Sequence, residues 1–144
     1  MKKKILNRMK LEFDATSQNE SFARMAVSVF AASLDPTLEE LSDLRVVISE
    51  AVTNAVVHAY KNKGGKIVIA ATLYDDKSLR LKIRDKGCGI KELEKCLQPL
   101  YTTDESGERG GMGFPIMQAM SDSFRVKTAP DEGTTLYIRF CFEG

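Results

Sequence analysis

The most informative part of this 144-residue chain is the stretch Ser49-Glu50-Ala51-Val52-Thr53-Asn54-Ala55-Val56-Val57-His58. Glu50, Asn54 and His58 are spaced four apart, so on an α-helix they form a polar stripe that drifts only about 40° per step. The opposite side of the same helix is apolar and carries Ile48, Val52, Ala55 and Val56. The stretch therefore predicts a helix that packs its apolar side on a core and presents a carboxylate and an amide on its other side.

Two interpretations of the polar stripe are open at this point. The stripe is consistent with an ordinary solvated helix face. It is also what a magnesium–phosphate site uses, because Glu and Asn supply hard oxygen ligands and a carboxylate can take a proton from a nucleophile. Motifs elsewhere in the chain are needed to decide between the two.

The stripe lies in the second of two predicted helices, and a capping box opens each of them. Ser17-Gln18-Asn19-Glu20 opens the first helix, which has about four turns. Its predicted apolar face consists of Phe22, Met25, Ala26, Val29 and Phe30. Thr37-Leu38-Glu39-Glu40 opens the second helix, which we expect to run to about Tyr60.

Strands and helices are segregated along the chain. Alternating or β-branched apolar residues predict strands at 10–13, 66–74, 79–83, 124–128 and 134–142, and short helices are predicted at 91–97 and 114–121. This order favours an α+β fold, a two-layer sandwich of a mostly antiparallel mixed sheet with helices on one face. The length predicts a single domain over residues 1–144.

Composition and charge exclude several classes of protein. Lys and Arg total 21 against 20 Asp and Glu, so the net charge of +1 argues against direct binding of nucleic acid. No apolar run is long enough for a membrane span or a secretory signal. The three cysteines, Cys88, Cys96 and Cys141, form no CxxC pair, so we expect neither a disulfide framework nor a zinc site, and a cytoplasmic setting.

Three glycine-containing motifs follow the second helix. Asp85-Lys86-Gly87-Cys88-Gly89 ends a predicted strand and would let the backbone approach a flat ligand, although many strand-ending turns look like this. Gly110-Gly111-Met112-Gly113, preceded by Arg109, opens a helix and could present amides to an anion, or could be a flexible surface loop. Gly133-Thr134-Thr135 leads into the last strand.

The motifs together resemble the ATP-binding domain of the GHKL superfamily, which includes gyrase, Hsp90, histidine kinases and MutL. Residues 50–58 look like its N box, 85–89 its first glycine box and 110–113 its second, and the resemblance runs from about Leu38 to the end. It implies a Bergerat ATP-binding fold that takes ATP or ADP with Mg²⁺.

The resemblance assigns roles residue by residue. It makes Glu50 the general base and Asn54 the Mg²⁺ ligand. It makes Asp85 the acceptor of a hydrogen bond from the adenine amino group, with the support of Thr134. The other nucleotide-binding positions that it implies are His58, Gly87, Gly89, Thr102, Thr103, Arg109, Gly110, Gly111, Met112 and Gly113.

A closer resemblance is to the family of sporulation anti-sigma-F factors, the SpoIIAB family. It is carried by Ser17–Arg24, Ser49–Ala55, Gln98–Thr103 and Gly111–Phe114, and it runs nearly end to end. It implies a homodimeric protein-serine kinase that holds sigma-F inactive and phosphorylates a serine of the anti-anti-sigma factor SpoIIAA. Glu20 and Arg24 on the first helix would face these partners.

Three other functions are compatible with parts of this pattern. The first is a paralogous stress-type anti-sigma kinase, which the motifs barely separate from the sporulation type. The second is a nucleotide-switched binding module without phosphotransfer, which would not need a carboxylate at Glu50. The third is a histidine kinase fragment, which is disfavoured because the single histidine, His58, lies inside the N-box stretch.

Overall fold

The computed structural model describes residues 3–91, 93 and 113–144. Its strands are β1 (Ile5–Asp14), β2 (Lys66–Tyr74), β3 (Ser78–Asp85), β4 (Ser123–Ala129) and β5 (Gly133–Cys141). Its helical elements are α1 (Gln18–Ala31), η1 (Ala32–Leu34), α2 (Leu38–Thr53), η2 (Asn54–Ala59) and α4 (Phe114–Met120). The predicted helix at 91–97 falls almost entirely outside the described residues, and so do Thr102, Thr103, Arg109, Gly110, Gly111 and Met112.

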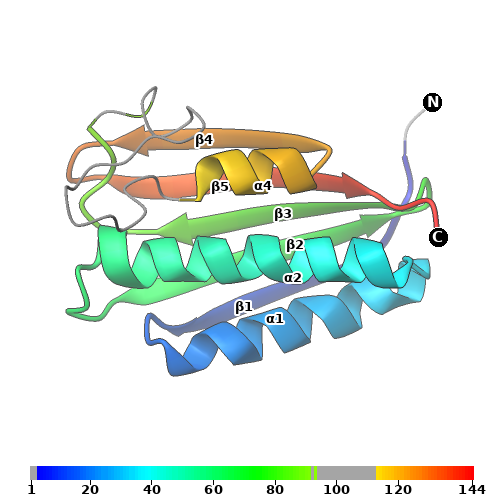
Figure 1. Cartoon of the computed structure of the whole chain (residues 1–144), viewed down its shortest axis with the longest axis horizontal. Helices are drawn as coiled ribbons and strands as arrows, with labels where there is room; N and C mark the ends of the chain where they lie inside the picture. The colour runs from blue at the N-terminus through cyan, green and yellow to red at the C-terminus, as the bar shows by residue number, and fades with distance from the viewer. Residues whose placement is uncertain (1–2, 92, 94–112) are drawn as a thin grey trace.

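The described elements form two layers, with the sheet behind and α1, α2 and α4 in front (Figure 1). The strand order is β1-β2-β3-β5-β4, and each of these four pairings is antiparallel. Helices therefore cover one face of an antiparallel sheet, which confirms the predicted α+β class. The first strand is longer than the sequence pattern predicts, because polar residues at its start still pair with β2.

The core lies between the sheet and the helices. Every second residue of β2, β3 and β5 is buried, as period-2 alternation requires for a sheet with one covered face. From α2 the core receives Ile48 and Val52, both fully buried, as the apolar side of the predicted helix should be. The largest contribution of α4 is Phe114, which is 1% exposed.

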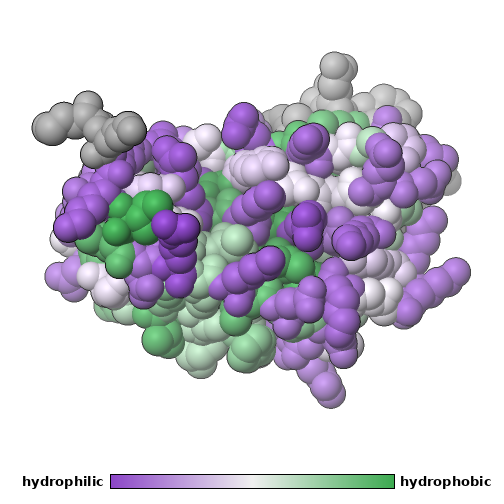
Figure 2. Space-filling model, turned by 180° about the vertical axis from the view of Figure 1, so that it is seen from behind, coloured by the Kyte–Doolittle hydropathy of each residue, from purple (hydrophilic) through white to green (hydrophobic). Residues whose placement is uncertain are grey.

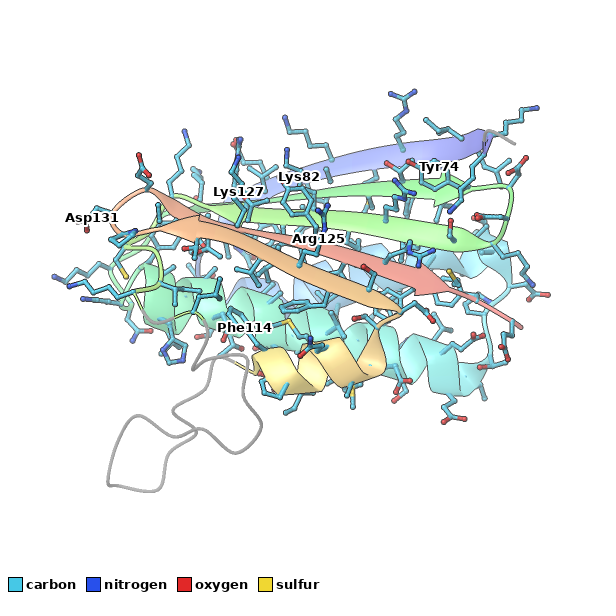
Figure 3. The ribbon with its side chains drawn as sticks, turned by 90° about the horizontal axis from the view of Figure 1, so that it is seen from above. Tyr74, Lys82, Phe114, Arg125, Lys127 and Asp131 are labelled. Atoms are coloured by element: carbon cyan, nitrogen blue, oxygen red, sulfur yellow. The ribbon has the colours of Figure 1, made fainter. Side chains whose placement is uncertain are left out.

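The other face of the sheet carries no helix and has many hydrophilic side chains (Figure 2), with Lys82, Arg125 and Lys127 among them (Figure 3). Cross-strand register places two acidic residues on it, Glu12 and Asp14, and nine cationic ones: Arg8, Lys10, Lys66, Arg80, Lys82, Arg84, Arg125, Lys127 and Arg139. Two tyrosines lie among them, with the Arg80 guanidinium 5.1 Å from the ring centre of Tyr74 and that of Arg125 5.3 Å from the ring centre of Tyr137. These cation–π contacts offset part of the repulsion between neighbouring cations.

The two predicted capping boxes have different outcomes. At the start of α2, the Thr37 side chain accepts from the Glu40 amide and the Glu40 carboxylate accepts from the Thr37 amide, so this box is confirmed. At the start of α1, Ser17 has helical dihedrals and makes no side-chain cap, so that box is wrong. Glu20 is instead engaged by side chains of its own helix and of α2.

The apolar face predicted for α1 is wrong at three of its five positions, while Phe30 packs partly buried against the core. The residues that α1 buries are Ala23, Val27, Ser28 and Ala31, a narrow row of small side chains that lets the helix lie close to its neighbours. Phe22, Met25 and Val29 are 50%, 63% and 67% exposed. The helix therefore has a second, uncovered apolar stripe on its outer side.

Among the residues that the structure describes, no helix combines the length and the apolar character needed to cross a membrane.

The Glu40 carboxylate fastens the chain end to the start of α2. Besides closing the capping box, it accepts from the amides of Glu143 and Gly144 at 2.8 and 3.2 Å. Burial raises the pKa of Glu40, but these hydrogen bonds together with those from Thr37 outweigh it, so the net pKa lies below its ordinary value of 4.5.

We predict that Glu40→Ala lowers the free energy of unfolding by about 1–2 kcal/mol at pH 7, because a cap and two further backbone bonds are lost. A carboxyl whose pKa is lowered by folding stabilises above its unfolded pKa, so the deficit should shrink as the pH falls below 4.5. Urea unfolding at several pH values measures both effects. The control is Glu39→Ala, which removes a neighbouring acid of the same first turn; equal losses for the two variants would contradict this account.

Candidate functional site

Sheet register brings Asp85, Thr134 and Thr128 together at one end of the sheet. Asp85 on β3 is directly opposite Thr134 on β5, which in turn is opposite Thr128 on β4. The same row begins with Phe13 and Ile67, both of which are buried in the core, so it faces the helices. Three polar side chains thus lie on the covered face of the sheet, where apolar ones are otherwise the rule.

The Asp85 carboxylate lies in this covered position with its charge partly supported. Burial raises its pKa above the ordinary aspartate value, while backbone hydrogen bonds from Gly87 and Thr134 lower it and partly offset the rise. The bond from the Gly87 amide measures 2.9 Å. An acceptor carboxylate held this way can receive a hydrogen bond from a ligand amine.

Threonine hydroxyls connect the neighbouring strand to the glycine loop. Thr128 Oγ1 lies 2.9 Å from Thr134 Oγ1, and it accepts from the Ile90 amide at 3.0 Å. The Asp131 amide donates to the Cys88 carbonyl. These bonds hold the loop after β3 against the β4–β5 turn. Nothing in the sequence marked Thr128, because its importance follows only from its place opposite Thr134.

The loop after β3 also rests on the end of the long helix. The Cys88 amide donates to the Ala59 carbonyl at 3.0 Å, and a Cβ at Gly87 would lie 2.5 Å from that same oxygen. Only a residue without a side chain allows this approach. Tyr60 adds a further tie, since its hydroxyl accepts from the Lys86 amide at 2.7 Å and donates to the Lys66 carbonyl at 2.6 Å.

The helix is not regular where it meets this loop. It is α-helical to Thr53 and then π-helical over η2, where the Tyr60 amide bonds to the carbonyl of Ala55, five residues earlier. The wider turn starts at Asn54 and rotates the residues after it away from a straight continuation of the predicted stripe. Single π turns are often found at functional sites.

A narrow pocket lies between the helix, the end of the sheet and α4. The lining residues are Ala51, Asn54, Ala55, Ala59, Ile83, Asp85, Gly89, Ile90, Phe114, Thr134 and Leu136. Its cavity volume of about 20 Å³ is enough for a single water molecule. A planar base would enter only if these walls moved apart. Asn54, Asp85, Gly89 and Thr134 of the predicted site therefore meet here, mostly among apolar groups.

Glu50 lies beside this pocket, at the start of α4. Gly113 has a φ of +69°, and a Cβ there would collide with the Glu50 carboxylate. The last glycine of the predicted second glycine motif is thus pressed against the predicted base. Figure 3 shows Phe114, the next residue, between α4 and the sheet. Glu50 and Asn54 each make further interactions within the structure.

His58 is on η2 but is not among the residues that line the pocket. Burial lowers its pKa below the ordinary histidine value, so the imidazole is neutral at pH 7. A neutral ring can share a hydrogen bond, but it brings no positive charge to a phosphate.

Within the described part of the chain, no group of three or more His, Cys, Asp or Glu side chains is placed to hold a metal ion. Asn54 is 9% exposed and offers one amide oxygen beside Glu50. This donor set fits Mg²⁺ that arrives with a ligand's phosphates, since Mg²⁺ is commonly held by few protein oxygens plus phosphates and waters.

The predicted partner-facing residues Glu20 and Arg24 form an ion pair on α1, with Arg24 Nη1 3.3 Å from Glu20 Oε1. Both are also bonded across the helix interface. Thr53 Oγ1 donates to Glu20 Oε2 at 3.2 Å, and Arg24 donates to Ser49 Oγ at 3.2 Å. Sequence reasoning missed these two hydroxyls, although each immediately precedes a predicted site residue.

A one-sided antiparallel sheet with a helix-covered aspartate pocket is the arrangement of one class of ATP-binding domain. Residues 13–140 match the histidine kinase-like ATPase domain family. Solved structures agree on the fold: the catalytic domain of the histidine kinase ThkA has a TM-score of 0.56 at 16% identity, covering 93% of this chain and 96% of that one. The structure of the RsbU and RsbW domains of Rv1364c from Mycobacterium tuberculosis has a TM-score of 0.68 at 23% identity. The match covers 94% of this chain and 32% of that one.

Relatives found by sequence identify the family more narrowly than the fold does. The anti-sigma F factor of Priestia megaterium is 50% identical over 134 residues, covering 92% of this chain and 91% of that protein. The anti-sigma F factor of Clostridium acetobutylicum is 46% identical over 133 residues, covering 92% of each. This chain therefore belongs to the anti-sigma F factor family of histidine kinase-like ATPase domains.

We predict that Gly113→Ala destabilises the fold by about 1–3 kcal/mol. Alanine is strained in the left-handed backbone conformation of this position, and its methyl group would displace the Glu50 carboxylate. Gly64→Ala is the matched control, since Gly64 has a φ of +86° and open space around the position of a Cβ. Chemical unfolding of both variants separates backbone cost from collision. Equal losses would show that Gly113 does not press on Glu50.

Proposed function

We propose that this chain is an anti-sigma factor and a protein-serine kinase. It binds sigma-F and holds it inactive, and it phosphorylates a serine of the anti-anti-sigma factor SpoIIAA with Mg-ATP. The observation that carries the proposal is the position of Glu50, a carboxylate against Gly113 and one helical turn before the pocket residue Asn54, in a chain that matches anti-sigma F factors over 92% of its length. A module that only bound nucleotide would not need that carboxylate.

Asp85 is the proposed adenine-reading residue. Its carboxylate accepts a hydrogen bond from the exocyclic amino group of adenine. Thr134, which is hydrogen-bonded to Thr128, supports the base. Gly87 and Gly89 keep the loop close to the helix and to the β4–β5 turn, so the base has a fixed edge to bind. Guanine has a carbonyl in place of that amine, and two facing acceptors would repel each other.

Glu50 and Asn54 are the proposed reactive pair. Glu50 takes the proton from the substrate serine hydroxyl as the serine oxygen bonds to the γ-phosphorus and ADP leaves. Asn54 holds the Mg²⁺ that accompanies ATP, and this ion supplies positive charge to the phosphates. The amides at Gly110–Gly113, with Arg109, Thr102, Thr103 and Met112, are proposed phosphate-side contacts, and His58 is proposed as a neutral neighbour.

The proposed partner surface is the exposed part of α1. Glu20 and Arg24 are partly exposed in the groove between α1 and α2, and the uncovered apolar stripe of Phe22, Met25 and Val29 lies on the outer side of the same helix. A surface that combines charged groups with exposed apolar side chains is typical of a protein interface. The charged pair would set orientation and the apolar stripe would supply buried area for sigma-F or SpoIIAA.

The family resemblance also leads us to propose a cytoplasmic homodimer. Light scattering should then give twice the 16.0 kDa mass of one chain. A single-chain mass at micromolar concentration would contradict this part of the proposal.

Transfer of labelled γ-phosphate from Mg-ATP to SpoIIAA tests the kinase. We predict that Glu50→Gln loses at least about a hundredfold in rate, within the usual range for a general base, while nucleotide affinity changes little. Glu39→Gln, on the exposed start of the same helix, is the control. Nucleotide binding by the native chain without transfer would support the switch module instead, and transfer only to a stress-type antagonist would support the paralogous kinase.

A separate test addresses Asp85. We predict that Asp85→Asn weakens ATP binding by about ten- to a hundredfold, the value of a hydrogen bond to a charged group, and narrows the preference for ATP over GTP. Because burial raises the pKa of Asp85, native affinity should begin to fall at a higher pH than an ordinary aspartate would cause. Calorimetric titration over pH measures this, with Asp75→Asn in an exposed turn as control. A pH dependence that is the same in Asp85→Asn and in the native chain would contradict the assignment.

A further inference from the structure

We propose that the hydroxyls of Thr53 and Ser49 are positioning groups through which the α1 surface controls the geometry of Glu50 and Asn54. This inference rests on the proposed kinase function and concerns how a docked protein substrate affects the rate of transfer. Neither hydroxyl touches the pocket: both act through the helix that carries the reactive pair.

Two polar bridges join α1 to α2 at this point. Glu20 Oε2 accepts from Thr53 Oγ1 at 3.2 Å, and Arg24 Nη1 donates to Ser49 Oγ at 3.2 Å. The same Arg24 nitrogen lies 3.3 Å from Glu20 Oε1, so the two bridges share one ion pair. Arg24 Nη2 also donates to Ser21 Oγ at 2.9 Å, so the five side chains form a single connected network rather than two independent contacts.

The position of the hydroxyls along α2 makes this network consequential. Ser49 and Thr53 are four residues apart and lie on one side of the helix, and each immediately precedes a member of the reactive pair. A rotation of α2 about its axis would therefore lengthen both bridges and move Glu50 and Asn54 together. Both bridges therefore oppose that rotation.

The second bridge also lies where the helix is least regular. Thr53 is the last residue of α2, and the π-helical η2 begins at Asn54. The hydrogen-bond pattern of the helix changes between these two residues. The bond from Thr53 to Glu20 holds the α-helical side of that junction and hence the direction of Asn54.

A docked partner can reach this network. The side chains of Arg24 and Glu20 are 39% and 29% exposed. An open groove between α1 and α2 is lined by both of them, by Ser49 and by Glu50. An acidic side chain of a partner would bind the Arg24 guanidinium, which has five donors, and compete with Ser49 for it. Docking on α1 would in this way change the hydrogen bond of Ser49, the residue next to the proposed base Glu50.

Thr53 permits a matched pair of substitutions. Thr53→Val keeps the shape of the side chain and removes the hydroxyl, whereas Thr53→Ser keeps the hydroxyl and removes a methyl group. We expect Thr53→Val to lower kcat for transfer to SpoIIAA by about ten- to a hundredfold, as small misplacements of reactive groups do. KM for the protein substrate and affinity for ATP should change less than about twofold, because no binding group is lost. Thr53→Ser should restore most of the rate.

A double-mutant cycle tests the connection to α1. If the hydroxyl acts through Glu20, the loss in kcat caused by Thr53→Val should be much smaller in a Glu20→Ala background than in the native chain. Ser49→Ala should behave in the same way against Arg24→Ala. Thr72→Val, on the open face of the sheet, controls for loss of a threonine hydroxyl elsewhere.

The outcomes separate the inference from the function on which it rests. Absence of transfer by the native chain would overturn the proposed kinase. Transfer by the native chain with equal kcat in Thr53→Val and Thr53→Ser would overturn only the positioning role. Equal losses in both backgrounds of the cycle would show that the hydroxyl supports the local fold without acting through α1, and would overturn it as well. Unfolding curves for each variant identify any loss of rate that comes from unfolded protein.

Discussion

The register of β3 against β5 is the constraint on which the rest of the molecule depends. It sets Asp85 opposite Thr134 on the face that the helices cover. A slip of one residue would turn Asp85 to the open face and bring a cationic neighbour, Arg84 or Lys86, toward the core. The hydrophobic residues of the two strands prevent that slip, because Leu79, Leu81 and Ile83 would be exposed by it. The apolar core thus fixes the position of the polar group that it surrounds.

Periodicity in the sequence is sufficient for much of this architecture. The sequence shows a β-branched run in β2, alternation in β3 and an apolar side on α2. Each pattern predicts an element that packs its apolar side on one shared core. The same holds for the Thr37–Glu40 capping box, in which all the participants lie within four residues. Asp85 and Asn54 could be placed in one site because known ATP-binding domains combine such motifs in this order. The spacing of the residues alone does not predict that they meet.

Other features depend on contacts between distant segments, and sequence patterns could not predict them. Ser17-Gln18-Asn19-Glu20 has the letters of a capping box, but Glu20 is bonded to Thr53 on another helix and is not available to close it. The apolar stripe of α1 looked like a core face, although Ala23, Val27 and Ala31 pack more closely than Phe22 or Met25 could. The end of the π turn is bonded to a distant loop, since the Cys88 amide donates to the Ala59 carbonyl.

The uneven placement of charge has a practical consequence. The net charge is only +1 and the isoelectric point is about 7.7, yet nine cationic side chains and only two acidic ones share the open face of the sheet. This face is therefore positively charged, and its field extends roughly one Debye length, about 8 Å at physiological salt. Near its isoelectric point it should still be retained by a cation-exchange resin, with the bare sheet turned toward the matrix. Its elution position would report the charge of that face and not the charge of the whole chain.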